Sequence, residues 1–261
     1  MKIATFDGEG VKGRRSLFLR WLAGGAAVLS AGLDATAGAQ TYEALFKTCY
    51  ASSLPDRVIA SCSALISRRL ADGQDLATAF KNRGNAYDDK GDHVRAMADF
   101  GEALAINARD ADAFNSRGTT FTALGQYDRA ILDFDQAAAL NPGSSLAYSN
   151  RCFARALMDQ LEAGLADCNE ALRLKSDNPG ALAARAFVHL KSRRADDAIA
   201  DYSAELRSRP DDPYSLFGRG LARYLKGDQP DGDRDIAAAR ATKPDIEDHM
   251  AKLGLKLRDF R

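Results

Sequence analysis

The chain has 261 residues, 46% of them hydrophobic, with 36 basic and 36 acidic side chains and four cysteines. Residues 1–39 contain five basic and three acidic side chains, so 31 basic and 33 acidic side chains remain in the rest of the chain. A nearly neutral chain lacks the basic excess of nucleic-acid-binding proteins, and we expect no nucleic-acid partner. The sequence has no phosphate-binding loop, nucleophile elbow or zinc-protease motif, so we expect no enzymatic activity, no cofactor and no bound metal.

The beginning of the chain predicts an export signal. Basic residues precede an uncharged stretch at 21–33, and the small residues at 37–39 form a cleavage pattern. The uncharged stretch is shorter than the about 20 residues that cross a bilayer, so we expect no stable membrane span in the mature chain. The pair Arg14-Arg15 suits the twin-arginine route, and the ordinary secretory route stays open. We therefore expect a signal peptide over 1–39 and a bacterial protein that is periplasmic or secreted.

Residues 40–74 predict a degenerate helical hairpin. The pair Asp56-Arg57 repeats the pair Asp128-Arg129 of a later segment, which sets the register of the second helix of this hairpin. Terminal units of helical stacks are commonly atypical because one of their faces meets water. We expect this hairpin to close the N-terminal end, and Asp75 to cap the helix that follows it.

From residue 84 onward a small residue recurs every 34 positions without insertion or deletion. Large apolar residues four positions before it and, in the first two units, aromatic residues three positions after it form the i, i+4, i+7 stripe of a helix face. A second stripe follows in each unit, and Pro142, Pro210 and Pro244 end the second helices. Asn178 and Asp212 are expected N-caps of the next first helices. The small column consists of Gly84, Gly118, Cys152, Ala186, Gly220 and Gly254.

This order of aromatic, small, aromatic, alanine, aromatic and proline residues at a step of 34 resembles the tetratricopeptide repeat. The resemblance covers about two thirds of the chain. It implies an all-α fold, an α-solenoid of stacked antiparallel helix pairs, with five repeat units over 77–244. Residues 245–261 are then a half repeat that forms a C-terminal capping helix, whose expected members are Met250, Leu253, Gly254 and Leu257.

Two charged columns accompany the repeats. We interpret them as a structural ladder of arginine–aspartate pairs, within a hairpin or across to its neighbour, because one functional site does not need five copies. Arg155, His189 and Arg223 replace the expected second aromatic residue, and we expect His189 to be a packing residue. The two columns are Arg83, Arg117, Arg151, Arg185 and Arg219, and Asp99, Asp133, Asp167, Asp201 and Asp235.

The four cysteines form two local pairs. Cys152 and Cys168 occupy facing columns of one hairpin, and Cys49 and Cys62 repeat that arrangement in the N-terminal hairpin. In an oxidising compartment two disulfides are expected, and buried free thiols are the alternative.

The resemblance also implies that the first helices line a concave groove, which receives an extended segment or a helix of another protein. Lys81 and Asn85 match the clamp that some family members use for acidic chaperone tails, but Ser116, Leu146 and Asn150 do not match it, so we expect no such clamp. The groove changes from polar to apolar along the chain, and the C-terminal helix is an alternative cover for its apolar part. The expected groove residues are Lys81, Asn82, Asn85, Asn115, Thr119, Asn150, Phe153, Phe187, Tyr214, Phe217, Leu221 and Tyr224.

The sequence thus predicts a non-enzymatic periplasmic scaffold that binds a partner peptide or helix in this groove. Two alternatives stay open. In the first, the chain is a redox-responsive thiol protein using Cys152 and Cys168; in the second, it is an architectural component of the cell envelope. The sequence carries no signal for an oligomeric state.

Overall fold

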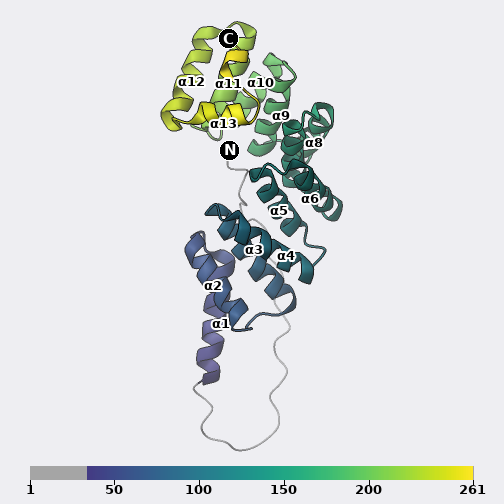
Figure 1. Ribbon diagram of the computed structural model, residues 1–261, viewed down its shortest axis with the longest axis vertical. Helices are drawn as coiled ribbons and strands as arrows, with labels where there is room; N and C mark the ends of the chain where they lie inside the picture. The colour runs from purple at the N-terminus through teal and green to yellow at the C-terminus, as the bar shows by residue number, and fades with distance from the viewer. Residues whose placement is uncertain (1–33, 261) are drawn as a thin grey trace, which may run out of the picture.

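The computed structural model describes residues 34–260, with side chains from Tyr42 onward. Within this range the chain forms thirteen α-helices and one short 3-10 helix, and no strand. Helices that follow one another in the chain pack in pairs, and the pairs stack from the α1–α2 end to the α11–α13 end (Figure 1). The predicted all-α solenoid is confirmed. The predicted signal peptide lies outside the described residues, except for residues 34–39, which begin the first helix.

The stack contains one N-terminal hairpin, five repeat hairpins and a short C-terminal segment. The N-terminal hairpin is α1 (Asp34–Ala51) and α2 (Pro55–Ser67). The repeat hairpins are α3 (Gly73–Asp89) with α4 (His93–Ile106), α5 (Ala111–Ala123) with α6 (Tyr127–Leu140), α7 (Ser145–Leu157) with α8 (Leu161–Leu174), α9 (Pro179–Lys191) with α10 (Ala195–Leu206), and α11 (Pro213–Lys226) with α12 (Gln229–Thr242). The C-terminal segment contains α13 (Ile246–Lys252) and the 3-10 helix η1 (Leu257–Asp259).

Two glycines of the small column are required because an aromatic ring of the second helix occupies the space where their side chains would be. A Cβ atom added at Gly84 would lie 2.8 Å from the ring of Phe100, and one added at Gly118 would lie 2.6 Å from the ring of Phe134. Both rings are fully buried. The glycines therefore let the two helices of a hairpin approach each other, which compensates for their low helix propensity of about 1 kcal/mol relative to alanine.

Side-chain caps start most of the repeat helices. The predicted caps are confirmed: Asn178 accepts a hydrogen bond from the backbone N–H of Ala181, and Asp212 accepts one from that of Ser215. Such caps satisfy N–H groups that have no partner within the helix. Four other N-caps bond in the same way, namely Asp92, Asp110, Ser144 and Asp228.

Both ends of the repeat array differ from the sequence-based expectation. The helix α3 begins at Gly73, so Asp75 lies in its first turn and does not cap it; Asp75 instead accepts a hydrogen bond from the hydroxyl of Tyr42 at 3.3 Å. At the other end, α13 stops at Lys252, so the expected helix through residue 257 is wrong.

Gly254 is the reason why α13 ends there. It adopts a left-handed φ of +85°, and the backbone N–H of Leu255 donates to the carbonyl of Met250 at 2.9 Å. This is the Schellman geometry in which a glycine just beyond the helix reverses the chain. Although Gly254 continues the 34-residue column, it terminates a helix and does not pack inside one.

The predicted arginine–aspartate ladder is confirmed, and the pairs form within hairpins. In each hairpin, Nε and Nη2 of the arginine donate to the two carboxylate oxygens of the aspartate at 2.6–2.9 Å. Most of these arginines also reach the preceding hairpin through Nη1, where the acceptors are Ser63, Asp135, Asn169 and Ser203. Among the described residues Arg117 has no such partner, because Gly101 occupies the corresponding position. The ladder therefore joins neighbouring hairpins as well as the helices of each.

Two of the later repeats add a second cation to the ladder where the family pattern has an aromatic residue. Nη1 of Arg155 lies 2.7 Å from Asp167, and Nη1 of Arg223 lies 2.8 Å from Asp235. His189 is buried beside Asp201, with Nε2 at 3.8 Å from the carboxylate, and burial lowers its pKa. The two arginines thus place a further donor against the buried aspartates Asp167 and Asp235.

The structure joins both expected cysteine pairs by disulfide bonds. Cys49 is bonded to Cys62 in the N-terminal hairpin, and Cys152 is bonded to Cys168 in the third repeat hairpin. All four cysteines are buried, and there is no free cysteine in the described part of the chain.

Candidate functional site

The first helices of the first two repeats present a polar surface. Lys81, Asn82, Asn115 and Thr119 are partly exposed, and Asn85 is exposed. These positions agree with the predicted groove, but their role in binding stays a prediction.

Several of the polar side chains have partners within the chain. The amide of Asn82 donates to the backbone carbonyl of Cys49 at 3.1 Å, which links the N-terminal hairpin to α3. The ammonium of Lys81 lies 2.9 Å from Asp110 and 3.9 Å from Asp112. Lys81 therefore already has carboxylate partners within the chain.

The apolar half of the predicted groove is covered in the structure. Phe217 and Leu221 are fully buried, and Phe187 is 3% exposed. They belong to one core cluster with Ile246 and Met250 of α13, so the C-terminal segment packs onto the strip that was expected to receive a partner. The other predicted groove residues of this half are buried as well, namely Asn150, Phe153 and Tyr224. Tyr214 is the one predicted residue of this half that is partly exposed.

The strip looked accessible because its helices carry apolar residues on more than one face, and periodicity alone does not show which face a short following helix will cover. Asn150 is the one polar residue in this buried set. Its amide donates to the side-chain oxygen of Asn115 at 3.1 Å, so two expected groove residues satisfy each other.

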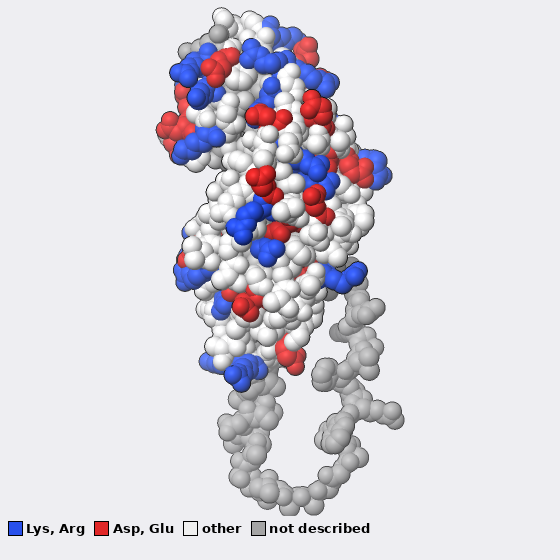
Figure 2. Space-filling view, turned by 45° about the vertical axis from the view of Figure 1, so that its right-hand side comes forward, with Lys and Arg blue, Asp and Glu red and all other residues white. Residues whose placement is uncertain are grey.

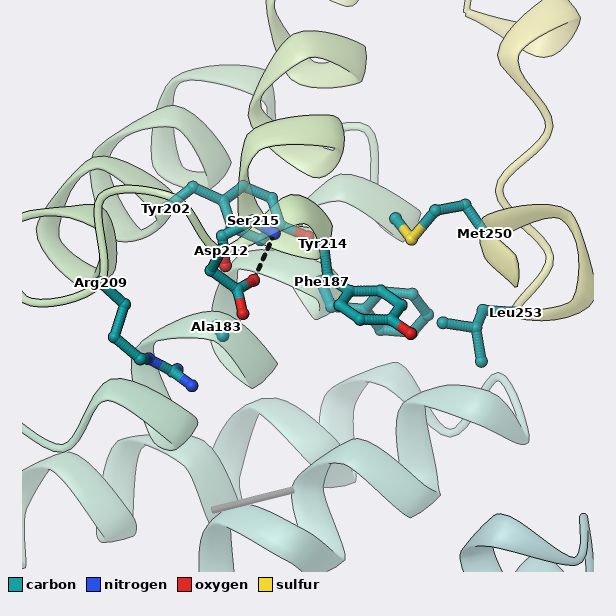
Figure 3. A pocket seen from close by; sticks show the side chains of 9 residues that line it. All are labelled: Ala183, Phe187, Tyr202, Arg209, Asp212, Tyr214, Ser215, Met250 and Leu253. Carbon is teal, nitrogen blue, oxygen red and sulfur yellow. Dashed lines mark hydrogen bonds between the residues drawn. The ribbon is translucent and has the colours of Figure 1, made fainter. Parts of the chain in front are cut away.

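A narrow slot marks the seam between α13 and the repeats. Figure 3 shows Met250 and Leu253 pointing from the C-terminal segment toward Phe187 and Tyr214. The slot measures about 20 Å³, which is room for one water molecule. The dashed line in Figure 3 is the cap between Asp212 and the backbone N–H of Ser215. The slot is too small for a ligand, and it shows how closely α13 fits the strip.

A larger cavity lies beside this seam. Its volume is about 410 Å³, within the range of about 300–1,000 Å³ that is typical of ligand sites. One wall comes from α7 and from the end of α5 with the turn that follows it, and the other comes from α11 and the C-terminal segment. Since the second repeat and the C-terminal segment line the same cavity, the stack curves around it. The lining residues are Thr122, Ala123, Leu124, Gly125, Tyr127, Phe153, Leu157, Tyr214, His249, Lys252 and Leu253.

Only Phe153 and Tyr214 of this lining belong to the predicted groove residues. Leu124, Tyr127, His249 and Lys252 were missed, because the first two follow the end of a first helix and the others lie on the C-terminal segment. No spacing rule within one repeat brings these positions together. The cavity depends on the curvature of the whole stack.

A second feature that was missed lies on α1. The rings of Tyr42 and Phe46 have centroids 5.6 Å apart, and those of Phe46 and Tyr50 are stacked at 3.9 Å. The spacing i, i+4, i+8 was readable from the sequence. Partial burial raises the pKa of Tyr50 to about 12, although the residue remains 38% exposed.

The described residues hold no cluster of three or more histidine, cysteine, aspartate or glutamate side chains suited to a metal ion. None of the helices in the described range is long and apolar enough to cross a membrane. Basic and acidic side chains alternate over the face that Figure 2 shows, with no broad patch of either sign.

Family models and solved structures identify the repeats. Residues 77–110 and 111–144 each match a model described as tetratricopeptide repeat. Comparison with the sequences of curated proteins finds no match.

Three solved structures illustrate the similarity of the fold. A tetratricopeptide repeat protein from Parabacteroides merdae is 17% identical with a TM-score of 0.62, covering 82% of this chain and 88% of its own. PilW, described as a widely conserved type IV pilus biogenesis factor, is 19% identical with a TM-score of 0.58. The match covers 64% of this chain and 77% of PilW. YrrB, described as a TPR protein with an unusual peptide-binding site, is 18% identical with a TM-score of 0.50. The match covers 74% of this chain and 96% of YrrB. The two family matches show that the chain contains tetratricopeptide repeats, and the solved structures show that it shares their fold.

Proposed function

We propose that the protein is a non-enzymatic scaffold of the periplasm that binds a peptide or helix of a partner protein in the cavity between α5, α7 and the C-terminal segment. The observation that carries the proposal is the cavity itself, about 410 Å³ in volume, lined by apolar and polar side chains from several hairpins. A site of this kind offers burial to one or more partner side chains and hydrogen bonds to its backbone.

The polar surface of α3 and α5 would extend this site. Asn85 is exposed and Thr119 partly exposed, so a segment that leaves the cavity toward the N-terminal end would meet hydrogen-bonding side chains. The relative YrrB is described as having a peptide-binding site, which supports the choice of a peptide as the partner.

The two disulfides support the proposed location. Disulfides persist in oxidising compartments such as the bacterial periplasm and are rare in the cytosol. Together with the expected signal peptide, they favour an exported protein. Mass spectrometry of the protein from its native cells tests this: we expect a mature chain that begins at Gln40 and appears in the periplasmic fraction. An intact Met1 in the cytosolic fraction would contradict it.

The redox-responsive alternative receives less support. Cys152 and Cys168 are both fully buried, whereas a regulatory thiol has to be reached by its reaction partner. An architectural role in the envelope remains compatible with the same scaffold and differs only in the identity of the partner.

Two exposed leucines allow a matched test of the binding site. Leu124 is 44% exposed and lines the cavity, whereas Leu132 is 64% exposed on α6 and does not line it. A peptide is first selected on the purified protein from a random display library, and its affinity is then measured by calorimetry. We expect Leu124→Asn to weaken binding at least about tenfold, equivalent to ~1.4 kcal/mol, and Leu132→Asn to leave it unchanged. Equal affinities for both variants would contradict the assignment of the site.

A further inference from the structure

The cavity has an uneven distribution of charge on its two walls. The wall from α5 and α7 contributes apolar and hydroxyl side chains, including Leu124 and Leu157. The wall from the C-terminal segment contributes Lys252 and His249, and these are the only titratable side chains of the lining apart from tyrosines. No aspartate or glutamate lines the cavity.

The acidic side chains near the cavity are directed to other partners. Asp245 lies 2.8 Å from Lys243 and 2.9 Å from His249, and Asp159, just beyond α7, lies 2.6 Å from Lys191. Asp128 and Asp248 adjoin lining residues in sequence but do not line the cavity.

Lys252 is free to meet a partner. Its side chain is exposed, and it has no ion pair within the described residues. A lysine of this kind on the rim of an apolar cavity attracts a carboxylate, and complementary charge at an interface determines specificity and the rate of encounter more than overall affinity.

We propose that the cavity selects segments in which a bulky apolar residue is flanked by the side chain of an aspartate or glutamate. The apolar residue would enter between Leu157 and Leu253, and the carboxylate would pair with Lys252. This inference rests on the proposed function and adds to it the chemistry of the partner. The site differs from a clamp on the first three repeats, because the C-terminal segment supplies its cation.

Lys256 provides a control for the charge. It is exposed and lies four residues after Lys252 in the same segment, but it is not part of the lining. Lys252→Glu and Lys256→Glu therefore change the net charge equally, and only the first reverses the charge at the cavity. Circular dichroism and melting of both variants verify that they stay folded.

The test is a peptide-display selection on the purified protein and on both variants. On the unchanged protein and on Lys256→Glu we expect peptides that combine Leu, Phe or Met with adjacent Asp or Glu. On Lys252→Glu we expect this acidic enrichment to be lost, and a selected acidic peptide to bind that variant about fivefold more weakly. Amidation of the peptide's C-terminus should leave its affinity unchanged, since the carboxylate belongs to a side chain.

The outcomes separate this inference from the function on which it rests. Peptides that bind Leu124→Asn poorly but show no acidic preference, or that tolerate Lys252→Glu, would overturn the inference and leave the proposed function standing. The absence of any peptide sensitive to Leu124→Asn would overturn both. Analytical ultracentrifugation addresses a second copy as the occupant: a concentration-dependent dimer that Leu124→Asn abolishes would also overturn the inference.

Discussion

The two halves of the repeat array use the same 34-residue pattern to different ends. In the first two repeats the first helices carry polar side chains that stay partly exposed, such as Asn85 and Thr119. In the last two repeats the same face carries Phe187 and Phe217, which are buried in one core cluster with Ile246 and Met250 of the C-terminal segment. The difference teaches that a half repeat without a second helix of its own finds its packing partner on the inner face, and so converts part of a groove into core.

This comparison also explains where the open cavity lies. It forms where the end of α13, at Lys252, faces the second and third repeats. The covered strip is an interior surface, whereas the cavity beside it remains available to a partner.

The largest effect should follow from truncating a covered aromatic residue. Phe217→Ala removes a fully buried ring and should lower the free energy of unfolding by about 3–5 kcal/mol, measured by urea denaturation. Asn85→Ala in the polar half serves as the control and should change it by less than about 0.5 kcal/mol. A Phe217→Ala protein of unchanged stability would mean that the strip is not core.

Loss of the two disulfides should destabilise different lengths of the stack. Replacing Cys152 and Cys168 by alanine opens a loop of 16 residues in the middle of the array, at a cost of about 3 kcal/mol. Replacing Cys49 and Cys62 affects the terminal hairpin, so we expect hydrogen exchange to rise mainly in α1 and α2. Equal and global effects of both double variants would contradict a stack in which each unit contacts only its neighbours.

The charged ladder distinguishes early from late repeats. Arg117→Ala leaves Asp133 buried without its cation and should cost about 2 kcal/mol, whereas Arg219→Ala leaves Arg223 on Asp235 and should cost about 1 kcal/mol. Both estimates allow for the partial exposure of the arginines. Thermal melting of the two variants compares them, and a larger loss for Arg219→Ala would show that Arg223 does not act as a second donor.

A gain in stability is expected at Gly101, where Arg117 has no side-chain acceptor among the described residues of the preceding hairpin. A Cβ atom at Gly101 meets nothing within 4 Å, and the position lies inside α4, so Gly101→Ala should add about 0.5–1 kcal/mol. Gly101→Asn should recover a further share of stability if its side chain accepts a bond from Arg117, because Asn169 does so for Arg185. Melting temperatures below that of the unchanged protein would contradict both expectations.

The smallest effect concerns a buried carboxylate in the later half. Glu205 is fully buried where the other repeats have Ala103, Ala137 and Ala171, and burial raises its pKa. The folded protein then binds this proton more tightly than the unfolded chain, so the contribution of Glu205 to stability is greatest at acidic pH and is lost as the pH rises through the folded pKa.

We therefore expect Glu205→Gln to be more stable than the unchanged protein at pH 7, with the difference shrinking toward pH 4. The ion pair with Arg209, 2.6 Å away, limits its size. Urea denaturation at several pH values measures it, and Glu162→Gln on the surface of α8 is the control. A difference that grows as the pH falls would contradict the assigned direction.

The sequence predicts what is local and periodic. The step of 34 residues places Gly84 against Phe100, Arg83 against Asp99 and Cys152 against Cys168, because each pair lies 16 residues apart within one hairpin. It does not predict that Gly254 ends a helix, because the same residue type fits both a packed column and a C-terminal cap.

The candidate site is less predictable for the same physical reason. Phe153 and Tyr214 were expected at the site, whereas Leu124 and Lys252 come from segments about 130 residues apart. Their proximity follows from the summed curvature of the stack and from the course of the chain after α12, and no single repeat encodes either. The burial of Phe217 depends on the same course.

The most direct test of the central claim is site-specific crosslinking in the native cells. A photoreactive residue replaces Leu124 at the cavity or Leu132 on α6, and adducts with the partner are identified by mass spectrometry. We predict a partner adduct from position 124 and none from position 132. An adduct from position 132 alone would place the binding surface on the second helices and contradict the account.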